Sequence, residues 1–259
     1  MDLPSLFDLK DRTAFISGAR GHLGQAMARA LGAAGAHLIV NGRDEAKLAA
    51  FEAQLREEGH SVTRAAFDMG DIGALRAFFG GLKRLDVLVN NAVAMQVKSF
   101  QALQPSDFAV TYQSAVIAAF EAARAALPAM KEAVARSGDA SIVNIASMYG
   151  QVSPDGRIYE TRDQQSPFHY GPAKAGLLQL TRHLAAEFGM SGIRVNALVP
   201  GPFPAAASAA LAQKLSSRTM LGRVGRADEV AGPLLFLATR ASSYMTGAAL
   251  NLDGGWTAW

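Results

Sequence analysis

The segment Thr13-Ala-Phe-Ile-Ser17, followed at once by Gly18-Ala-Arg-Gly21-His-Leu-Gly24, decides the fold. Its first five residues are mainly apolar and predict a short buried strand. After the glycines, apolar residues recur at helical spacing from Leu23 until Gly35. A strand, a glycine turn and a helix open a dinucleotide-binding βα unit, in which amides at the helix start approach a pyrophosphate. The alternative is that the glycines only shape a tight turn; the strand and helix around them favour the phosphate site.

Outward from this unit, apolar strands alternate with amphipathic helices. We expect strands at 37–41, 61–66, 86–91, 140–145, 194–199 and 249–253, and helices at 45–58, 72–82, 106–135, bent near Pro128, and from 170 to a stop at Gly189. Continuous apolar strands of this kind are typical of a parallel sheet covered on both faces. The prediction is a single α/β domain over residues 1–259, a Rossmann fold with a doubly wound, seven-stranded parallel sheet and helices on both faces.

Two segments, 151–167 and 203–226, depart from this alternation. The first is polar and rich in turn-forming residues, and the second becomes basic toward its end. Both follow the carboxyl ends of strands, where open α/β sheets bind ligands. We therefore interpret both as candidate substrate loops, the alternative being surface decoration.

The composition argues against several classes of protein. The chain has 259 residues, of which 25 are basic and 22 acidic, and the net charge of 25 − 22 = +3 is too small to indicate nucleic-acid binding. There is no cysteine, and the five histidines lack metal-ligand spacing, so we expect no metal site. No apolar run reaches the roughly 20 residues that span a bilayer, and the first residues do not resemble a secretory signal. These features predict a cytoplasmic protein with no membrane partner.

A second stretch, Tyr170-Gly-Pro-Ala-Lys174, carries the candidate chemistry. Its two ionisable residues are four positions apart (174 − 170 = 4), so on a helix they share one face. A free phenol loses its proton near pH ~10, and a cation nearby lowers that pKa. Tyr170 tuned in this way can exchange a proton with an alcohol or a ketone while a hydride moves elsewhere. The spacing alone also fits a solvated surface pair.

The end of the second expected strand bears on the choice of cofactor. In dinucleotide folds an acidic residue there bonds the ribose 2′-hydroxyl, whereas an arginine accepts a 2′-phosphate. This chain has Gly42-Arg43, and Arg20 in the glycine turn adds a second positive charge. Both features favour NADP(H) over NAD(H). Alternatively, Arg43 is a solvated charge that Asp44 partly neutralises.

Several short motifs, spread over nearly the whole chain, together resemble the classical type of the short-chain dehydrogenase/reductase family. They are Ser17-Gly-Ala-Arg-Gly-His-Leu-Gly24, Asp68, Asn90-Asn-Ala92, Ile142-Val-Asn-Ile-Ala-Ser147, Tyr170-x-x-x-Lys174, Arg194-Val-Asn196, Pro200-Gly201 and Asp253-Gly-Gly255. No single motif is specific, whereas the combination is.

The resemblance implies a role for each matching residue. Tyr170 would be the general acid/base, Ser147 would bond the substrate oxygen, and Lys174 would lower the Tyr170 pKa and bond the nicotinamide ribose. The other cofactor-binding residues would be Gly18, Arg20, Gly21, His22, Leu23 and Gly24 of the turn, Arg43, Asp68 and Met69 near the adenine, Asn91 and Ala92 near its ribose, and Pro200 and Gly201 near the nicotinamide. A hydroxyl at a strand end and a phenol on the next helix would hold and protonate the reacting oxygen. For Ser147, the alternative is an ordinary turn cap.

Four positions depart from the family pattern. His22 stands where the family commonly has glycine, and Val93 where glycine follows the Asn-Asn-Ala motif. Ala205 stands about where a threonine often bonds the carboxamide. Ala115 replaces an asparagine that usually holds a proton-relay water. That replacement implies a relay rewired through Ser114 or water, a slower enzyme, or a protein that binds cofactor without turnover.

Ser147 and Tyr170 are separated by 23 positions (170 − 147 = 23), more than the family usually shows. The residues between them, with Pro200-Gly-Pro-Phe-Pro204 and the end of the chain, resemble the subgroup around gluconate 5-dehydrogenase and related sugar or sugar-acid oxidoreductases. Basic residues in and after the insertion could pair with an anionic substrate or only solvate the loop; they are Arg157, Arg162, His169 and the later arginines, Arg218, Arg223 and Arg226.

Trp256 and Trp259 near the end of the chain are costly to leave exposed, so we expect a subunit contact there. The family resemblance likewise implies a homo-oligomer, a tetramer or a dimer.

The leading hypothesis is an NADP(H)-dependent oxidoreductase that interconverts a secondary alcohol and a ketone on a small molecule, a sugar acid or a polyol. One alternative keeps the chemistry and changes the substrate to a 3-oxoacyl thioester or another ketone. The other is a non-catalytic protein that binds cofactor on an enzyme scaffold.

Overall fold

A single parallel sheet positions the rest of the molecule. The structure, a computed structural model, describes residues 3–161 and 165–259. The strands lie in the order β3-β2-β1-β4-β5-β6-β7, all parallel to their neighbours. Their bounds are β1 (Thr13–Ile16), β2 (His37–Gly42), β3 (Val62–Ala66), β4 (Val87–Asn90), β5 (Ala140–Ile145), β6 (Ile193–Pro200) and β7 (Ala249–Leu252). The order reverses between β1 and β4, which opens a crevice at their carboxyl ends.

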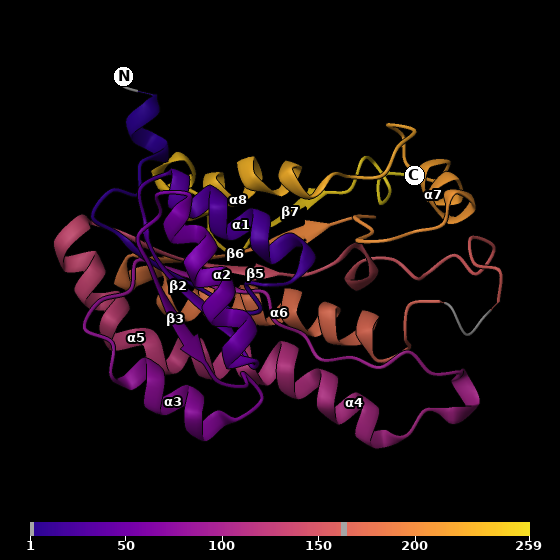
Figure 1. The fold of residues 1–259 in the computed structure, drawn as a ribbon, viewed down its shortest axis with the longest axis horizontal. Helices are drawn as coiled ribbons and strands as arrows, with labels where there is room; N and C mark the ends of the chain where they lie inside the picture. Colours follow the sequence, from indigo (N-terminus) through magenta and orange to yellow (C-terminus); the bar gives the residue numbers. More distant parts are fainter. Residues whose placement is uncertain (1–2, 162–164) are drawn as a thin grey trace.

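Helices cover both faces of this sheet. They are α1 (His22–Ala33), α2 (Glu45–Glu57), α3 (Ile72–Gly80), α4 (Pro105–Tyr112), α5 (Ala118–Ser137), α6 (Tyr170–Phe188), α7 (Ala209–Ser216) and α8 (Ala231–Ala238). Helices α1 and α8 pack together on one face, and α3 and α5 pack together on the other (Figure 1). The predicted α/β Rossmann fold with a seven-stranded parallel sheet is therefore confirmed.

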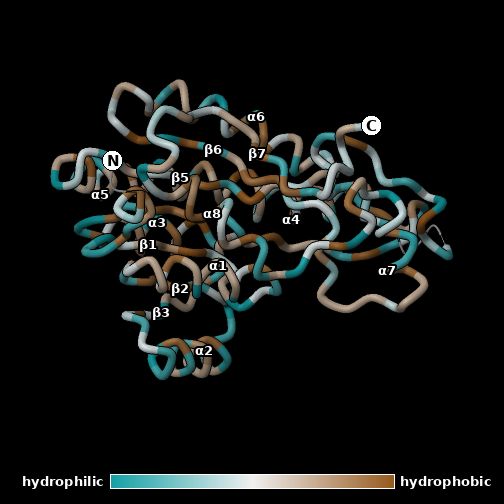
Figure 2. Tube along the Cα trace, turned by 90° about the horizontal axis from the view of Figure 1, so that it is seen from above, coloured by the Kyte–Doolittle hydropathy of each residue, from teal (hydrophilic) through white to brown (hydrophobic). Residues whose placement is uncertain are grey.

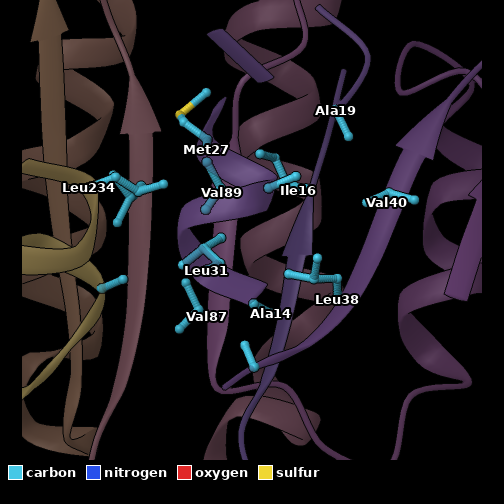
Figure 3. Close-up of a cluster of buried hydrophobic side chains, with 14 of the residues drawn as sticks. Ala14, Ile16, Ala19, Met27, Leu31, Leu38, Val40, Val87, Val89 and Leu234 are labelled. Carbon is cyan, nitrogen blue, oxygen red and sulfur yellow. The ribbon is translucent and has the colours of Figure 1, made fainter. Parts of the chain in front are cut away.

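Alternate residues of β1 enter two separate hydrophobic layers. Ile16 packs with Met27 and Leu31 of α1 (Figure 3). Phe15 enters the opposite layer, where its ring centroid lies 4.7 Å from that of Phe79 in α3. Hydrophobic colour accordingly concentrates on the strands and hydrophilic colour on the surrounding loops (Figure 2). Because both faces of the sheet are covered, a polar side chain within it needs hydrogen-bond partners.

The expected helix at 106–135 is divided at a different place from the one we predicted. Helix α5 continues through Pro128, and the irregular turn is a π-helical segment, η3 (Gln113–Ile117). Proline removes a single intrahelical hydrogen bond, which an exposed helix surface tolerates, whereas a π-turn inserts an extra residue into the ladder. The irregular segment therefore contains Ser114 and Ala115, the residue that stands in place of the family's relay asparagine.

The region after β6 is more regular than the sequence indicated. Helix α7 lies within 203–226, and α8, which we did not predict, follows the short turn η7 (Ala227–Val230). The apolar run from Val230 to Ala238 was the available signal, because Leu234 and Leu237 are buried against the sheet. In the described residues, none of the helices is long and apolar enough to cross a lipid bilayer.

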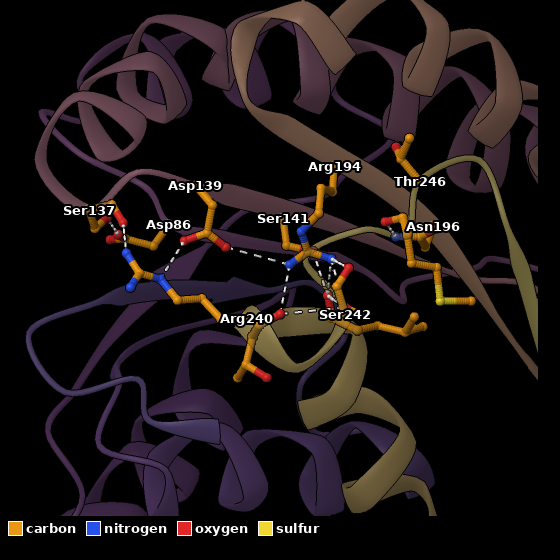
Figure 4. Close-up of polar contacts among 12 residues, drawn as sticks. Asp86, Ser137, Asp139, Ser141, Arg194, Asn196, Arg240, Ser242 and Thr246 are labelled. Carbon is orange, nitrogen blue, oxygen red and sulfur yellow. Dashed lines mark hydrogen bonds and ion pairs between the residues drawn. The ribbon is translucent and has the colours of Figure 1, made fainter. Parts of the chain in front are cut away.

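Buried polar groups connect the amino ends of the strands to α8 and to the turn η8 (Arg240–Ser242). Arg194 of β6 donates to the carbonyl oxygens of Leu237, Thr239 and Ser242 and to Ser242 Oγ (Figure 4). Asp139 lies 3.6 Å from its guanidinium. This edge of the sheet is therefore closed by a network that the protein supplies by itself.

Candidate active site

A cleft of about 520 Å³ lies at the opposite edge, over the carboxyl ends of the strands. Every predicted cofactor-binding or catalytic residue lines it except Arg20; these lining residues are Gly18, Gly21, His22, Leu23, Gly24, Arg43, Asp68, Met69, Asn91, Ala92, Ser147, Tyr170, Lys174, Pro200 and Gly201. Its volume is that of a typical small-ligand pocket. The structure thus brings together residues from seven separate parts of the chain.

The glycine turn is shaped to let a ligand approach the backbone. Gly18 has a φ of +60°, which side chains other than glycine rarely adopt, and a Cβ at Gly24 would collide with the Gly18 carbonyl. Asn91 Nδ2 donates to the carbonyls of Ser17 and Gly18 at 2.9 and 3.1 Å, which fixes the turn against β4. The first-turn amides of α1 have no partner inside the helix and point toward this cradle. Its shape and charge fit a pyrophosphate.

At the end of β2, Arg43 lines the cleft, and its Nη1 lies 3.7 Å from the Asp68 carboxylate. Asp44, the expected partner of Arg43, instead accepts from the Lys47 amide and pairs with the Lys47 ammonium at 3.0 Å. Asp44 is the N-cap of α2, and this capping role explains the difference. Arg20 is exposed outside the lining, although its charge still acts on Asp44.

Ser147 and Tyr170 meet at the other end of the cleft. Ser147 follows β5, and its Oγ accepts from the Tyr149 amide at 3.2 Å, so it does cap the short turn η4 (Met148–Gly150). Its own hydrogen remains available, and a hydrogen bond from Ser147 acts on the Tyr170 phenol. The turn cap and the contact with the phenol are therefore compatible roles for this hydroxyl.

Lys174 is buried one helical turn after Tyr170. Its Nζ donates to the carbonyl of Ile145 at 2.6 Å and lies 5.6 Å from the centroid of the Tyr170 ring. Burial lowers the pKa of Lys174 to about 8. Burial also raises the pKa of Tyr170, and the hydrogen bond from Ser147 opposes that shift. The expected lowering by Lys174 is not among the causes that set the pKa of Tyr170, in which desolvation of the phenol dominates.

A chain of buried amides supports this end of the cleft. Asn90 Nδ2 donates to Asn144 Oδ1 at 2.8 Å, and Asn144 Nδ2 donates to Thr181 Oγ1 at 2.9 Å. These bonds connect β4, β5 and α6 directly beneath the candidate catalytic residues. The motif residues Asn90 and Asn144 therefore act on the geometry of the site without lining the cleft.

Ser114 lines the cleft next to the missing relay asparagine, but its hydroxyl is already engaged. Its Oγ accepts from the Ala94 amide at 2.9 Å and donates to carbonyls of its own helix. Ala115 is buried in the π-helical segment. A relay through Ser114 would have to break these contacts, so it is not preformed. Ala205 is exposed and does not line the cleft.

The two candidate substrate loops contact each other beside the cleft. Ile158 and Tyr159 of the first pack with Leu215 of the second and with Trp256. Trp256 is therefore buried within its own chain, and our expectation of a subunit contact there was wrong for this residue. Trp259 remains exposed.

Most of the basic side chains proposed for an anionic substrate have other partners. Arg157 and Arg218 lie 2.8 and 3.6 Å from Asp155. Arg223 and Arg226 both pair with Glu229, and His169 is fully buried. None of these side chains lines the cleft, and Asp155 and Glu229 neutralise the four arginines. Arg162 lies outside the described residues.

Sequence reasoning missed part of the lining. The missed residues are Asn41, Gly42, Phe67, Val93, Ala94, Met95, Ser114, Ile145, Ala146 and Phe203. Most of them lie within two positions of a predicted residue, so proximity in the chain was the available signal. Among the described residues, no group of His, Asp and Glu side chains is arranged to hold a metal ion.

Comparisons with known proteins agree with this geometry. A family model described as enoyl-(acyl carrier protein) reductase matches residues 18–257. The chain is 29% identical to the gluconate 5-dehydrogenase of Gluconobacter oxydans, with 99% of both chains covered. It is 32% identical to the galactitol 2-dehydrogenase (L-tagatose-forming) of Cereibacter sphaeroides, with 100% of both chains covered.

A solved structure shows the same likeness in three dimensions. The crystal structure of a gluconate 5-dehydrogenase from Burkholderia cenocepacia J2315, in complex with NADP and tartrate, matches with a TM-score of 0.87 at 30% identity, covering 99% of both chains. Sequence and fold therefore agree with these proteins over nearly the full length. The chain belongs to the short-chain dehydrogenase/reductase family and is an NAD(P)-dependent oxidoreductase of its gluconate-dehydrogenase-like subgroup.

Proposed function

We propose that this enzyme interconverts a secondary alcohol and a ketone on a polyol, a sugar or a sugar acid, with NADP(H) as the preferred cofactor. The observation that carries the proposal is the meeting of the Ser147 and Tyr170 hydroxyls at one end of the cleft, beside the buried Lys174. The relatives named for gluconate and galactitol support this class of substrate.

The proposed division of labour follows from the contacts. Bound NADP(H) supplies or accepts the hydride. Tyr170 gives a proton to the ketone oxygen in reduction and takes it from the alcohol in oxidation. Ser147 donates to the same oxygen, because its Oγ accepts from the Tyr149 amide and its hydroxyl hydrogen, directed at the phenol, can turn to a bound substrate. Lys174 places a positive charge near the phenol, which stabilises the phenolate when Tyr170 has lost its proton.

The charges around the cleft favour a neutral polyol or sugar within this class. Arg43 and His22 lie at the end of the cleft with the glycine turn, and Lys174 lies beneath Tyr170. The arginines of the two loops are paired with Asp155 and Glu229. In the described part of the lining, no further basic side chain stands opposite Ser147 to hold a carboxylate.

The experiment that tests the activity is a Tyr170→Phe variant assayed against galactitol, D-gluconate and related polyols and sugar acids. Loss of the phenol hydroxyl removes the proton donor, so we expect kcat to fall by about 10³-fold or more. NADPH affinity, measured by nicotinamide fluorescence, should change little. Full activity of this variant with a substrate of the wild type would contradict the role of Tyr170.

The proposed preference for NADP(H) rests on Arg43. Its guanidinium is exposed at the cleft, and Asp68 at 3.7 Å is a weak partner that a 2′-phosphate can replace. Arg43→Leu should lower kcat/KM for NADP⁺ by about 10- to 100-fold and leave that for NAD⁺ nearly unchanged. Equal losses with both cofactors would show that Arg43 does not recognise the 2′-phosphate.

A second candidate substrate class is a 3-oxoacyl thioester or another apolar ketone. The apolar side chains of Met95 and Phe203 line the cleft near the reacting end, and Val97 is exposed on the same segment as Met95. Reduction of acetoacetyl-CoA with NADPH, together with no turnover of polyols and sugar acids, would select this reading.

We further propose that residues 1–259 form one domain, in which the segments 151–167 and 203–226 border the substrate. We also propose that the enzyme is cytoplasmic and that it assembles from identical copies. A contact between copies is supported by four exposed apolar side chains on α4, η3 and α5: Phe108, Val110, Ile117 and Phe120. Sedimentation equilibrium of the wild type and of Phe120→Glu tests the assembly. A wild type that is monomeric at micromolar concentration would refute the oligomer.

A further inference from the structure

His169 directly precedes Tyr170 and has no part in the chemistry proposed above. Its side chain is fully buried at the start of α6, where it does not cap the helix. Its Nδ1 lies 2.9 Å from Thr111 Oγ1 of α4, and its Nε2 lies 3.1 Å from the carbonyl oxygen of Gln96. Both ring nitrogens therefore connect the residue before the phenol to other segments of the chain.

The segment that His169 reaches forms a wall of the cleft. Residues 91–99 have no regular secondary structure, and Ala94 and Met95 line the cleft. Backbone groups in such a segment need partners from elsewhere when they are buried. Ser114 Oγ accepts from the Ala94 amide, and Thr111 Oγ1 donates to the Ala94 carbonyl, both at 2.9 Å. Together with His169, these side chains hold the wall in place.

The hydrogen-bond roles follow from what each atom can accept. The Gln96 carbonyl only accepts, so Nε2 of His169 carries a proton. Thr111 has one hydroxyl hydrogen and two neighbours that can take it, the Ala94 carbonyl and Nδ1 of His169. When Nδ1 carries a proton, it donates to Thr111 Oγ1, and the Thr111 hydroxyl donates to the Ala94 carbonyl. When Nδ1 carries none, it competes with the Ala94 carbonyl for the Thr111 hydroxyl hydrogen. His169 and Thr111 thus act on the wall as one unit.

The charged groups around this unit already form a pair. Lys98 and the Gln104 amide lower the pKa of Asp107 in α4, with a smaller contribution from His169, and the Asp107 carboxylate binds the Lys98 ammonium at 2.6 Å. Asp107 also accepts from the Gln104 amide at the start of α4. The ring edge of Phe108 packs on the imidazole, with centroids 5.8 Å apart. The site is enclosed, so it is a cross-link within the protein and no ligand site.

We propose that His169 is a positioning residue that, with Thr111, fixes the cleft wall at 94–96 relative to the phenol of Tyr170. The wall and the phenol border the same end of the cleft, and His169 is covalently joined to one and hydrogen-bonded to the other. A displacement of about 1 Å between groups that hold a substrate can cost about 10²-fold in rate. The inference rests on the proposed function of Tyr170, so its first test requires no turnover.

Amide hydrogen exchange tests the cross-link directly. His169→Phe keeps a buried ring and removes both hydrogen bonds, whereas Thr111→Val keeps the side-chain shape and removes the hydroxyl. We expect each to speed exchange of the amides of 94–98 by about tenfold or more, while those of β5 are unchanged. Unchanged exchange in 94–98 for both variants would overturn the proposal, whatever Tyr170 does.

Kinetics then separate positioning from mere stability. With galactitol and NADP⁺, kcat/KM should fall by about tenfold or more in His169→Phe and Thr111→Val, and Thr111→Ser, which restores the hydroxyl, should recover most of it. The Kd for NADPH should stay within about twofold. A lowered Tm with normal kcat/KM in both variants would refute a positioning role. Full activity of Tyr170→Phe would instead refute the function proposed for Tyr170. If the wild type does not oxidise galactitol, the hydrogen-exchange result alone decides whether His169 and Thr111 hold the wall.

Discussion

Two buried cations lie at opposite edges of the sheet, and the protein satisfies them very differently. Arg194, at the amino end of β6, donates to three carbonyls and to Ser242 Oγ, with Asp139 3.6 Å away (Figure 4). Lys174, beside the carboxyl end of β5, donates to the carbonyl of Ile145, and no described carboxylate pairs with it. Both are buried to a similar degree.

The difference separates a structural charge from one that is kept for a ligand. Burial lowers the pKa of Arg194, but Asp139 opposes the shift, and the side chain joins β6 to α8 and η8. No carboxylate among the described residues opposes the desolvation of Lys174, whose pKa is lowered to about 8. An incompletely satisfied buried charge costs stability, so its presence in a cleft indicates a function.

The largest effect we expect comes from removing the ligand-directed cation. Lys174→Met leaves a side chain of similar volume and removes the charge beside Tyr170. Turnover should fall by about 10³-fold or more, equivalent to about 4 kcal/mol of transition-state stabilisation. The free energy of unfolding at pH 7.5 should stay the same or rise, because a desolvated charge is lost. Steady-state kinetics and chemical denaturation of the same preparation measure both.

The structural cation should show the reverse pattern. Arg194→Met removes four hydrogen bonds from a buried guanidinium and its ion pair with Asp139, so the free energy of unfolding should fall by about 3 to 4 kcal/mol. The kcat/KM of the folded fraction should remain near that of the wild type, since Arg194 is at the far edge from the cleft. An Arg194→Met enzyme of normal stability, or a strongly destabilised Lys174→Met, would remove the distinction between the two sites.

The sequence does not distinguish these two cations by pattern. Each is a basic residue in an apolar run, and each belongs to a recognisable motif. The partners of Arg194 come from Leu237, Thr239 and Ser242, more than 40 positions later, in a helix and turn that we had not predicted. Only folding brings them to β6. The strand pattern predicted the sheet because periodicity is local, whereas this network depends on contacts distant in the chain.

The candidate site divides in the same way. The glycine turn and the Tyr170–Lys174 spacing were readable because each lies within a few consecutive residues. The wall at 94–96 was not, because Thr111 of α4, Ser114 of η3 and His169 at the start of α6 reach it from three other elements. We had expected His169 either to pair with an anionic substrate or to be solvated, because a histidine beside a polar insertion is usually exposed. Burial of Trp256 escaped prediction for the same reason: its contacts come from both loops.

The smallest effect, and the sharpest test of the comparison, is in how stability depends on pH. The pKa of Lys174 is about 8 in the folded protein and about 10.4 when unfolded. Below pH 8 the lysine is protonated in both states, and the cost of its burial is constant. Between these values the unfolded state binds more protons, so the contribution of Lys174 to stability becomes more favourable as pH rises. The gain should approach about 3 kcal/mol by pH 10.5.

Tyrosines titrate in the same range, so this gain must be isolated by difference. The raised pKa values of Tyr149 and Tyr170 delay their ionisation in the folded protein, so these two groups lower stability at high pH, in the wild type and in Lys174→Met alike. Subtracting the denaturation free energies of Lys174→Met from those of the wild type at pH 7.5, 8.5, 9.5 and 10.5 should leave a rising curve. The same subtraction with Arg194→Met should be flat, because a guanidinium stays charged in both states. A flat curve for Lys174 would mean that its ammonium is solvated or paired, and its burial would then say nothing about a ligand.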